Sequence, residues 1–194
     1  MVIKNMKEFF KNNNKGFTLV EALVAISIFT VSILGLLSVL SQGIADTSYA
    51  KQKVVATYLA EEGIEYIRNM RDTFVLFDPD GHDDGWGEFK TKLLSASCDA
   101  GEGCYFDDSE LDYTESGQPM TQIAVDSCNG SCPPILYTTG RYSITNGPPS
   151  GYTRKIQLEE ISDQEVKVTS TVYWTQGSGD YNISFSENLY NWQP

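Results

Sequence analysis

The residues of this 194-residue chain that could do chemistry are few and unevenly placed. The sequence has one histidine, which leaves little material for a histidine-based catalytic dyad or a multi-histidine metal site. It shows no nucleophilic elbow, no recognisable pair of catalytic carboxylates and no phosphate-binding loop. We therefore expect that the protein is not an enzyme. Three features remain: an acidic residue inside an apolar run, a cluster of aspartates and four cysteines.

The acidic residue is Glu21, in the most apolar part of the chain. It is the only charged residue of residues 17–40, FTLVEALVAISIFTVSILGLLSVL. As a helix these residues would be about 36 Å long, which exceeds the roughly 30 Å hydrocarbon core of a bilayer. The composition therefore predicts a transmembrane helix. An unpaired carboxylate in such a helix costs a few kcal/mol or more, which makes Glu21 a candidate functional residue.

The flanks of the apolar run indicate how it is oriented. Residues 1–16 hold four lysines and one glutamate, a net charge of +3, which predicts a cytoplasmic N-terminus and an exported remainder. A secretory signal peptide is the alternative, but its apolar region is normally about 7–15 residues long. Residues 41–50 also lack a convincing small-x-small cleavage site. No lysine or arginine lies in the run, whereas a cut after Gly16 would give Phe17 an α-amine at the depth of Glu21.

The residues around this boundary resemble a known signal, which combines a basic leader, a glycine, an aromatic residue, Thr-Leu-Val-Glu and a long apolar helix. In this chain they are Lys15-Gly16-Phe17-Thr18-Leu19-Val20-Glu21. The pattern is similar to the class III signal of type IV prepilins and type II secretion pseudopilins, and its continuation resembles minor pilins and minor pseudopilins. The resemblance is close over residues 11–45 and looser to residue 75. The alternative is a plain single-pass anchor whose Glu21 lies near the headgroups by accident.

The resemblance implies a processing and assembly mechanism. Prepilin peptidase would cleave between Gly16 and Phe17, and the new N-terminus of Phe17 would be methylated. Glu21 would neutralise the amine of a neighbouring subunit's first residue. The implied partners are prepilin peptidase, an inner-membrane assembly platform, other pilin or pseudopilin subunits and the lipid bilayer. The implied location is the inner membrane, with a cytoplasmic N-terminus, and then a pilus or pseudopilus at the cell surface or in the periplasm.

The helical pattern continues beyond the apolar run. From Ser41 to Thr73 there is no proline, and residues that trace one helical face recur at spacings of three and four. These residues are Val55, Leu59, Gly63, Ile67, Met70 and Phe74. We predict four segments along the chain. They are a leader peptide at 1–16, a membrane or filament-core helix at 17–40, its amphipathic continuation at 41–75 and an extracytoplasmic head at 76–194.

A cluster of aspartates follows the predicted helix. Its members are Asp78, Asp80, Asp83 and Asp84. Calcium binds several carboxylate and carbonyl oxygens, so a calcium site is one hypothesis for this cluster. The EF-hand pattern fails, because no Asp or Asn stands at the fifth place and no Glu at the twelfth counted from Asp78. We therefore favour an acidic, solvated loop and expect no cofactor.

The four cysteines form two close pairs, Cys98 with Cys104 and Cys128 with Cys132. Their spacings differ from the tight C-x₂-C pairs of zinc ribbons. Residues exported from the cytoplasm meet an oxidising environment, in which thiols form disulfides. Four cysteines allow three connectivities. We favour local pairing, Cys98–Cys104 and Cys128–Cys132, because it needs the least loop closure.

After residue 134 the period of the sequence changes to two. A short hairpin is predicted between Ile135 and Ile144, and alternating runs follow at 156–158, 166–174 and 183–185. Alternation of this kind predicts an antiparallel meander with one apolar face and one solvent-exposed face. The apolar stripe of the long helix would cover the apolar face. The predicted fold class is α+β, with a long N-terminal helix packed on an antiparallel β-sheet head, which matches the lollipop shape of pilins.

The charge of the chain narrows its function. It has 14 Lys+Arg against 26 Asp+Glu, a formal net charge of −12, and because the leader holds +3 the residues after Gly16 carry −15. A protein that binds nucleic acid over a broad surface needs clustered cations, so we expect no direct binding of nucleic acid. The leading hypothesis is a minor pilin or pseudopilin of a type IV pilus, type II secretion or competence-like filament. The alternative is a surface adhesin or tip subunit whose acidic head binds a ligand, with or without calcium.

Overall fold

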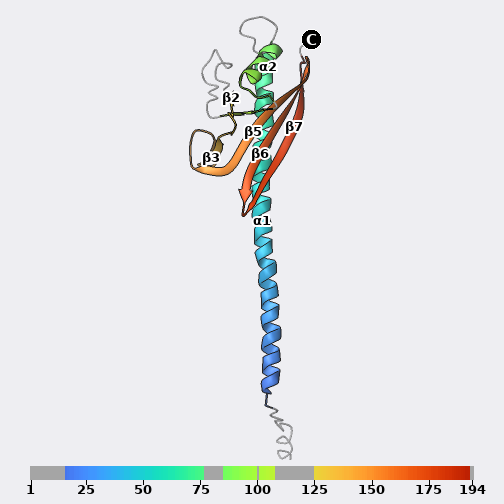
Figure 1. Ribbon diagram of the computed structural model, residues 1–194, viewed down its shortest axis with the longest axis vertical. Helices are drawn as coiled ribbons and strands as arrows, with labels where there is room; N and C mark the ends of the chain where they lie inside the picture. Colours follow the sequence, from blue (N-terminus) through green and yellow to red (C-terminus); the bar gives the residue numbers. More distant parts are fainter. Residues whose placement is uncertain (1–15, 77–84, 100, 108–124, 193–194) are drawn as a thin grey trace, which may run out of the picture. The chain divides into compact units, whose positions relative to one another are not determined.

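The structure is a computed structural model that describes residues 16–76, 85–99, 101–107 and 125–192 (Figure 1). The elements are α1 (Leu19–Leu76), α2 (Gly85–Ser95), β1 (Cys104–Phe106), β2 (Val125–Ser127), β3 (Pro134–Thr138), β4 (Arg141–Ser143), β5 (Pro149–Ser162), β6 (Glu165–Gln176) and β7 (Gly179–Tyr190). The chain divides into two compact units, Met1–Ser48 and Tyr49–Pro194. The predicted α+β class, a long N-terminal helix and an antiparallel sheet, is confirmed.

The long helix predicted from the sequence is α1, which has 58 residues. Within the second unit it buries the predicted stripe from Leu59 to Phe74, whereas Val55, at the start of the stripe, is only half-buried. The helix also buries residues on both sides of this stripe, so its apolar face is wider than the spacing predicted. These additional buried residues are Ala56, Ala60, Ile64, Tyr66 and Val75.

The sheet is built around the meander of β5, β6 and β7, in which each strand pairs antiparallel with the next. β6 occupies one edge of β5, and the other edge pairs with β3 near the start of β5 and with β1 at Ile156. β2 extends the sheet from β1, and β4 extends it from β3. The predicted meander is confirmed, and so is the predicted hairpin, which is β3 and β4.

The core of the second unit lies between α1 and one face of the sheet. The alternate residues of β6 on this face are all buried: Val166, Val168, Ser170, Val172 and Trp174. Helix and sheet lie close together at Gly63, where an added Cβ would lie 2.3 Å from the Ser170 Oγ and 2.9 Å from the Ile156 Cδ1. A glycine that weakens an isolated helix is therefore required here by packing.

One helix, α2, was not predicted from the sequence. It contributes Trp86, Phe89 and Leu93 to the core, and these residues are spaced by three and four, as a helical face requires. The Trp86 Nε1 donates a hydrogen bond to the Asp163 carbonyl at 2.7 Å, which ties α2 to the β5–β6 turn. The helical spacing was visible in the sequence, but the segment is short and borders the acidic cluster.

Candidate functional site

The helix α1 begins just after the boundary between Gly16 and Phe17. Thr18 closes its first turn, because its Oγ1 accepts a hydrogen bond from the Glu21 backbone N–H at 3.2 Å and its carbonyl accepts one from the Ala22 N–H at 3.1 Å. This is the arrangement of a helix N-cap, and Thr-x-x-Glu is the spacing of a capping box. The capping role of Thr18 was not predicted, although the spacing could have shown it.

Glu21 is the third residue of α1 and is exposed. At this position its negative charge meets the positive end of the helix dipole, which is favourable. Among the residues that the structure describes, no ion pair includes Glu21. The helix therefore positions a carboxylate without neutralising it, and its pairing with an amine of another subunit stays a prediction.

In the described part of the first unit, which begins at Gly16, the large apolar side chains have almost no partners in the chain. From Phe17 to Ile44 the large apolar residues are exposed, with fractions that range from 39% at Ile33 to 77% at Leu19. The helix is long and apolar enough to cross a membrane, and its most apolar 18-residue window contains no buried residue, so this part of the helix is not packed into the core of the second unit. Such a surface requires lipid or protein around it, and it fits membrane anchoring.

Three hydroxyl groups of the apolar run, those of Ser27, Thr30 and Ser32, donate hydrogen bonds within the helix itself. Ser27 donates to the carbonyls of Leu23 and Val24 at 3.0 and 2.9 Å. Thr30 donates to the Ser27 carbonyl at 2.9 Å, and Ser32 to the carbonyl four residues before it at 2.8 Å. Because these hydroxyls need no water, they do not oppose transfer of the helix into lipid.

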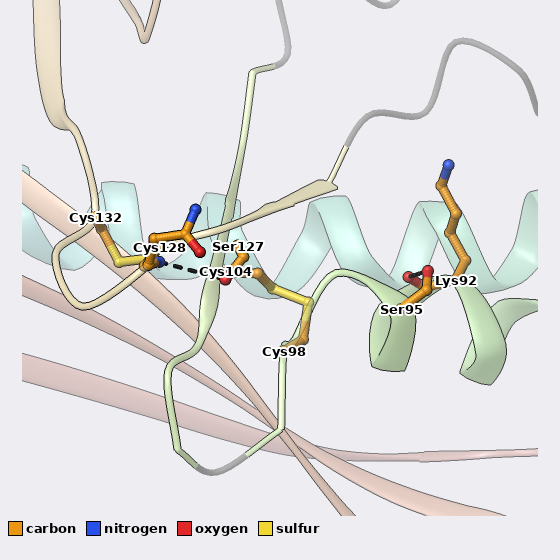
Figure 2. The surroundings of a disulfide bond; sticks show 8 residues. Lys92, Ser95, Cys98, Cys104, Ser127, Cys128 and Cys132 are labelled. Atoms are coloured by element: carbon orange, nitrogen blue, oxygen red, sulfur yellow. Dashed lines mark hydrogen bonds between the residues drawn. A yellow bond between two sulfur atoms is a disulfide. The ribbon is translucent and has the colours of Figure 1, made fainter.

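The head contains two disulfide bonds, Cys98–Cys104 and Cys128–Cys132 (Figure 2). These are the two local pairs that the loop-closure argument favours. Cys104 begins β1 and pairs across the sheet with Ser127, the residue before Cys128, so the two bonds lie close together. The Cys98 carbonyl also accepts a hydrogen bond from the Leu158 N–H at 2.6 Å, which ties the first disulfide to β5.

The four aspartates proposed as calcium ligands, Asp78, Asp80, Asp83 and Asp84, lie outside the described residues. Within the described ranges, no group of three or more histidine, cysteine, aspartate or glutamate side chains is placed to hold a metal ion. The structure therefore identifies no metal centre in the part of the chain that it describes.

A buried arginine that was not predicted fastens α1 to the sheet. The Arg154 Nη1 donates to the Leu59 carbonyl at 3.0 Å and to the Glu62 carboxylate at 2.6 Å, and the guanidinium lies 3.9 Å from the centre of the Phe106 ring. The sequence did contain a sign of this contact, because Arg154 stands at a core-facing position of β5, where the alternating pattern predicts an apolar residue. Burial of this charge is tolerated because it is paired and hydrogen-bonded.

A second arginine, Arg68 of α1, joins the helix to β7 through the Glu187 carboxylate and also bonds to Glu65. The hydrogen bond to Glu187 is the main reason why the pKa of Arg68 is raised above its ordinary value, and the nearby acidic groups add to it. Both arginines therefore fix how α1 lies on the sheet within the second unit. No residue of the apolar run takes part in these contacts.

Comparison with known proteins bears on the N-terminal segment. Residues 11–37 match the family model described as the prokaryotic N-terminal methylation motif. No curated protein and no solved structure matches the chain significantly. The matched residues contain Gly16, Phe17 and Glu21, and they include no residue of the head. The chain thus carries the prokaryotic N-terminal methylation motif at the start of a long apolar helix, which is the N-terminal arrangement of pilins with a class III signal peptide.

Proposed function

We propose that this protein is a structural subunit, a minor pilin or pseudopilin, of a type IV pilus, type II secretion or competence-like filament. The observation that carries the proposal is the methylation motif at residues 11–37, placed at the start of a helix whose apolar side chains are exposed. The work of the subunit is assembly through this helix rather than catalysis. The energy for assembly comes from partner proteins.

Processing is the first step of the proposed function. Gly16 and Phe17 precede the helix and are exposed, and the space around Gly16 is open for 4 Å. Prepilin peptidase in the inner membrane would hydrolyse the peptide bond between Gly16 and Phe17, which removes the basic leader. The products are the leader with a new carboxylate at Gly16 and a mature chain with an α-amine at Phe17, which is then methylated.

Assembly is the second step. In the bilayer the Glu21 carboxylate lacks a partner on its own helix, and an unpaired charge at this depth is unfavourable by a few kcal/mol. The amine of a neighbouring subunit's Phe17 removes this penalty when the two helices come together. The apolar side chains of residues 17–40 exchange contacts with lipid for contacts with other helices, and these contacts hold the filament together. The ion pair between Glu21 and the neighbouring amine selects the correct position of the neighbour.

The test of this proposal is the identity of the mature N-terminus. In a strain with an active prepilin peptidase, mass spectrometry of the membrane fraction should find a chain that begins with methylated Phe17. We expect Gly16→Ala to leave uncleaved precursor. Gly35→Ala is the matched control, because Gly35 also lies in open space but inside the helix, and this variant should be processed normally. A wild-type chain that keeps its leader would overturn the proposal.

A further inference from the structure

The strand β7 forms one edge of the sheet (Figure 1). It has 12 residues, and within the described ranges it pairs with β6 alone. Natural sheets protect long edges with charged residues, proline or bulges, because unpaired N–H and C=O groups attract other chains. From Tyr181 to Ser186 the strand has no charged residue and no proline, and its pairing with β6 runs without a shift of register. This edge is therefore open to a further strand.

The β6–β7 turn shows which backbone groups point to the free edge. Its loop has two residues, Gly177 and Ser178, and the φ of Gly177 is +60°, as a type II′ turn requires. The pair that closes such a turn, Gln176 with Gly179, is hydrogen-bonded, and bonded pairs alternate with non-bonded pairs along an antiparallel ladder. The residues whose N–H and C=O groups point away from β6 are therefore Asp180, Asn182, Ser184, Ser186 and Asn188.

A groove of about 290 Å³ lies between this edge and α1. Arg68 of α1 bonds to Glu187 of β7, which holds the helix and the strand side by side. Ile183 and Phe185 face the core but are only half-buried, because β7 lies at the edge of the sheet. We call this groove the acidic groove, and its lining includes Glu61, Ile64, Glu65, Arg68, Phe185 and Glu187.

The charges of the acidic groove favour a basic partner. Its lining contains three glutamates and one arginine, a net charge of −2. Arg68 bonds to two of these carboxylates, whereas Glu61 takes part in no ion pair among the described residues. Glu61 and Glu65 are one helical turn apart, about 6 Å along the axis, and alternate residues of a strand are about 7 Å apart. Two basic side chains at alternate positions of an added strand therefore match these two carboxylates.

A second copy of this chain does not fit the same edge. If β7 paired with β7 of another copy, the two acidic grooves would come together, and like charges across strands are unfavourable. The other strands at the margins of the described sheet are β2 and β4, and each has three residues, too few to cover an edge of 12. The occupant that the charges and the length favour is therefore a segment of a different protein.

We propose that the free edge of β7 and the acidic groove form a docking surface for an extended, basic segment of a partner protein, which adds a strand to the sheet. The backbone of this segment pairs with the outward N–H and C=O groups of β7, which supplies affinity. Its side chains on the helix side supply specificity, because an apolar residue contacts Phe185 and two basic residues reach Glu61 and Glu65. The surface uses no residue of the methylation motif, so this proposal is independent of the proposed function.

The test measures binding of a fluorescent peptide, Thr-Lys-Thr-Val-Thr-Lys-Thr, to the full chain in micelles of a neutral detergent. Its threonines favour an extended conformation, and its valine and lysines lie on one face of a strand. We expect saturable binding by fluorescence anisotropy, weakened at least about threefold when salt rises from about 50 to about 300 mM. Replacement of both lysines by glutamate should abolish binding. Equal binding of the two peptides, or no binding of the lysine peptide, overturns the proposal.

Two substitutions at one position test the backbone of the edge. Ser184→Pro removes an N–H that points away from β6, so the β6–β7 ladder stays intact and the peptide loses a hydrogen bond. Ser184→Ala is the matched control, because it keeps this N–H. We expect the proline variant to weaken binding at least about fivefold and the alanine variant to leave it unchanged. Glu61→Gln should weaken binding about threefold, and circular dichroism checks that each variant is folded. Unchanged binding by the folded proline variant overturns the proposal.

Two N-methylated peptides make the test independent of how the variants fold. One carries N-methyl groups on its threonines, and the other carries them on its valine and lysines. In an added strand only one of these two sets of N–H groups faces β7, the first set for antiparallel and the second for parallel pairing. One peptide should therefore lose binding while the other keeps it, and equal binding of both overturns strand addition. A dimer of the chain that excess lysine peptide does not dissociate in sedimentation would assign the edge to a second copy and also overturn the proposal.

Discussion

The two units of the molecule use apolar residues in opposite ways. In the second unit, the apolar side chains of α1, α2 and the sheet bury one another, and two disulfides and two arginines fix their arrangement. In the described part of the first unit, nearly the same residue types stay exposed along a single helix. The second unit therefore supplies its own partners, whereas the first depends on lipid or on other chains. A substitution should thus affect folding in one unit and assembly in the other.

Among the substitutions that test this difference between the units, Glu21→Val is expected to have the largest effect, and the effect is on assembly. The variant should be processed normally and its head should fold, because no described ion pair of the head includes Glu21. Incorporation into filaments should fall at least about tenfold, since an unpaired carboxylate in lipid is worth a few kcal/mol of driving force for pairing. Immunoblots of sheared filaments and of membranes measure the ratio of assembled to membrane-bound subunit. Normal incorporation would show that Glu21 does not guide assembly.

A smaller effect separates the units through two glycines of the same helix. At Gly63 the Cβ of alanine would collide with the Ser170 Oγ, so Gly63→Ala should destabilise the second unit by about 1–3 kcal/mol. Gly43 has nothing within 4 Å of its Cβ position, so Gly43→Ala should leave the second unit unchanged. Urea unfolding followed by Trp fluorescence compares both variants with the wild-type chain. Equal midpoints for the two variants would contradict the tight contact at Gly63.

The smallest expected effect is a dependence of the second unit on alkaline pH. Burial raises the pKa of the Tyr152 hydroxyl above its ordinary value of about 10, and the neighbouring Tyr142 adds to this. The folded state then holds its proton more tightly than the unfolded state, so stability is full below pH ~10 and falls as the pH rises through the folded-state pKa. Tyr152→Phe should reduce this fall in urea midpoints between pH 9 and pH 11. An unchanged slope would show that Tyr152 does not contribute.

The features that the sequence predicted are those whose signal is local. The absence of proline and the three-and-four spacing predicted α1 and its buried stripe, and alternation predicted the meander of β5 to β7. The methylation motif is also local, because its residues follow one another in the chain. The patterns of α1 and of the meander were sufficient because each repeats over many residues, and the motif was sufficient because it combines several residue types at fixed neighbouring positions.

The features that were missed depend on contacts between distant residues or on short segments. Arg154 bonds to Glu62, which is 92 residues away, and no spacing in the sequence relates the two. The strands β1 and β2 have three residues each, too few for alternation to be recognised. The cap at Thr18 is a local signal, but it rests on one threonine and one glutamate, and no repeating pattern reinforces it.

Three hydroxyl groups of the apolar run affect the free energy with which the helix moves from lipid into contact with other helices. Ser27, Thr30 and Ser32 bond to carbonyls of their own helix, so neither lipid nor neighbouring helices must supply a partner for them. Moving the helix from lipid to a protein environment breaks none of these three bonds. The free energy of the transfer therefore comes from the apolar contacts and from the pairing of Glu21 with an amine, and these hydroxyl groups contribute little to it.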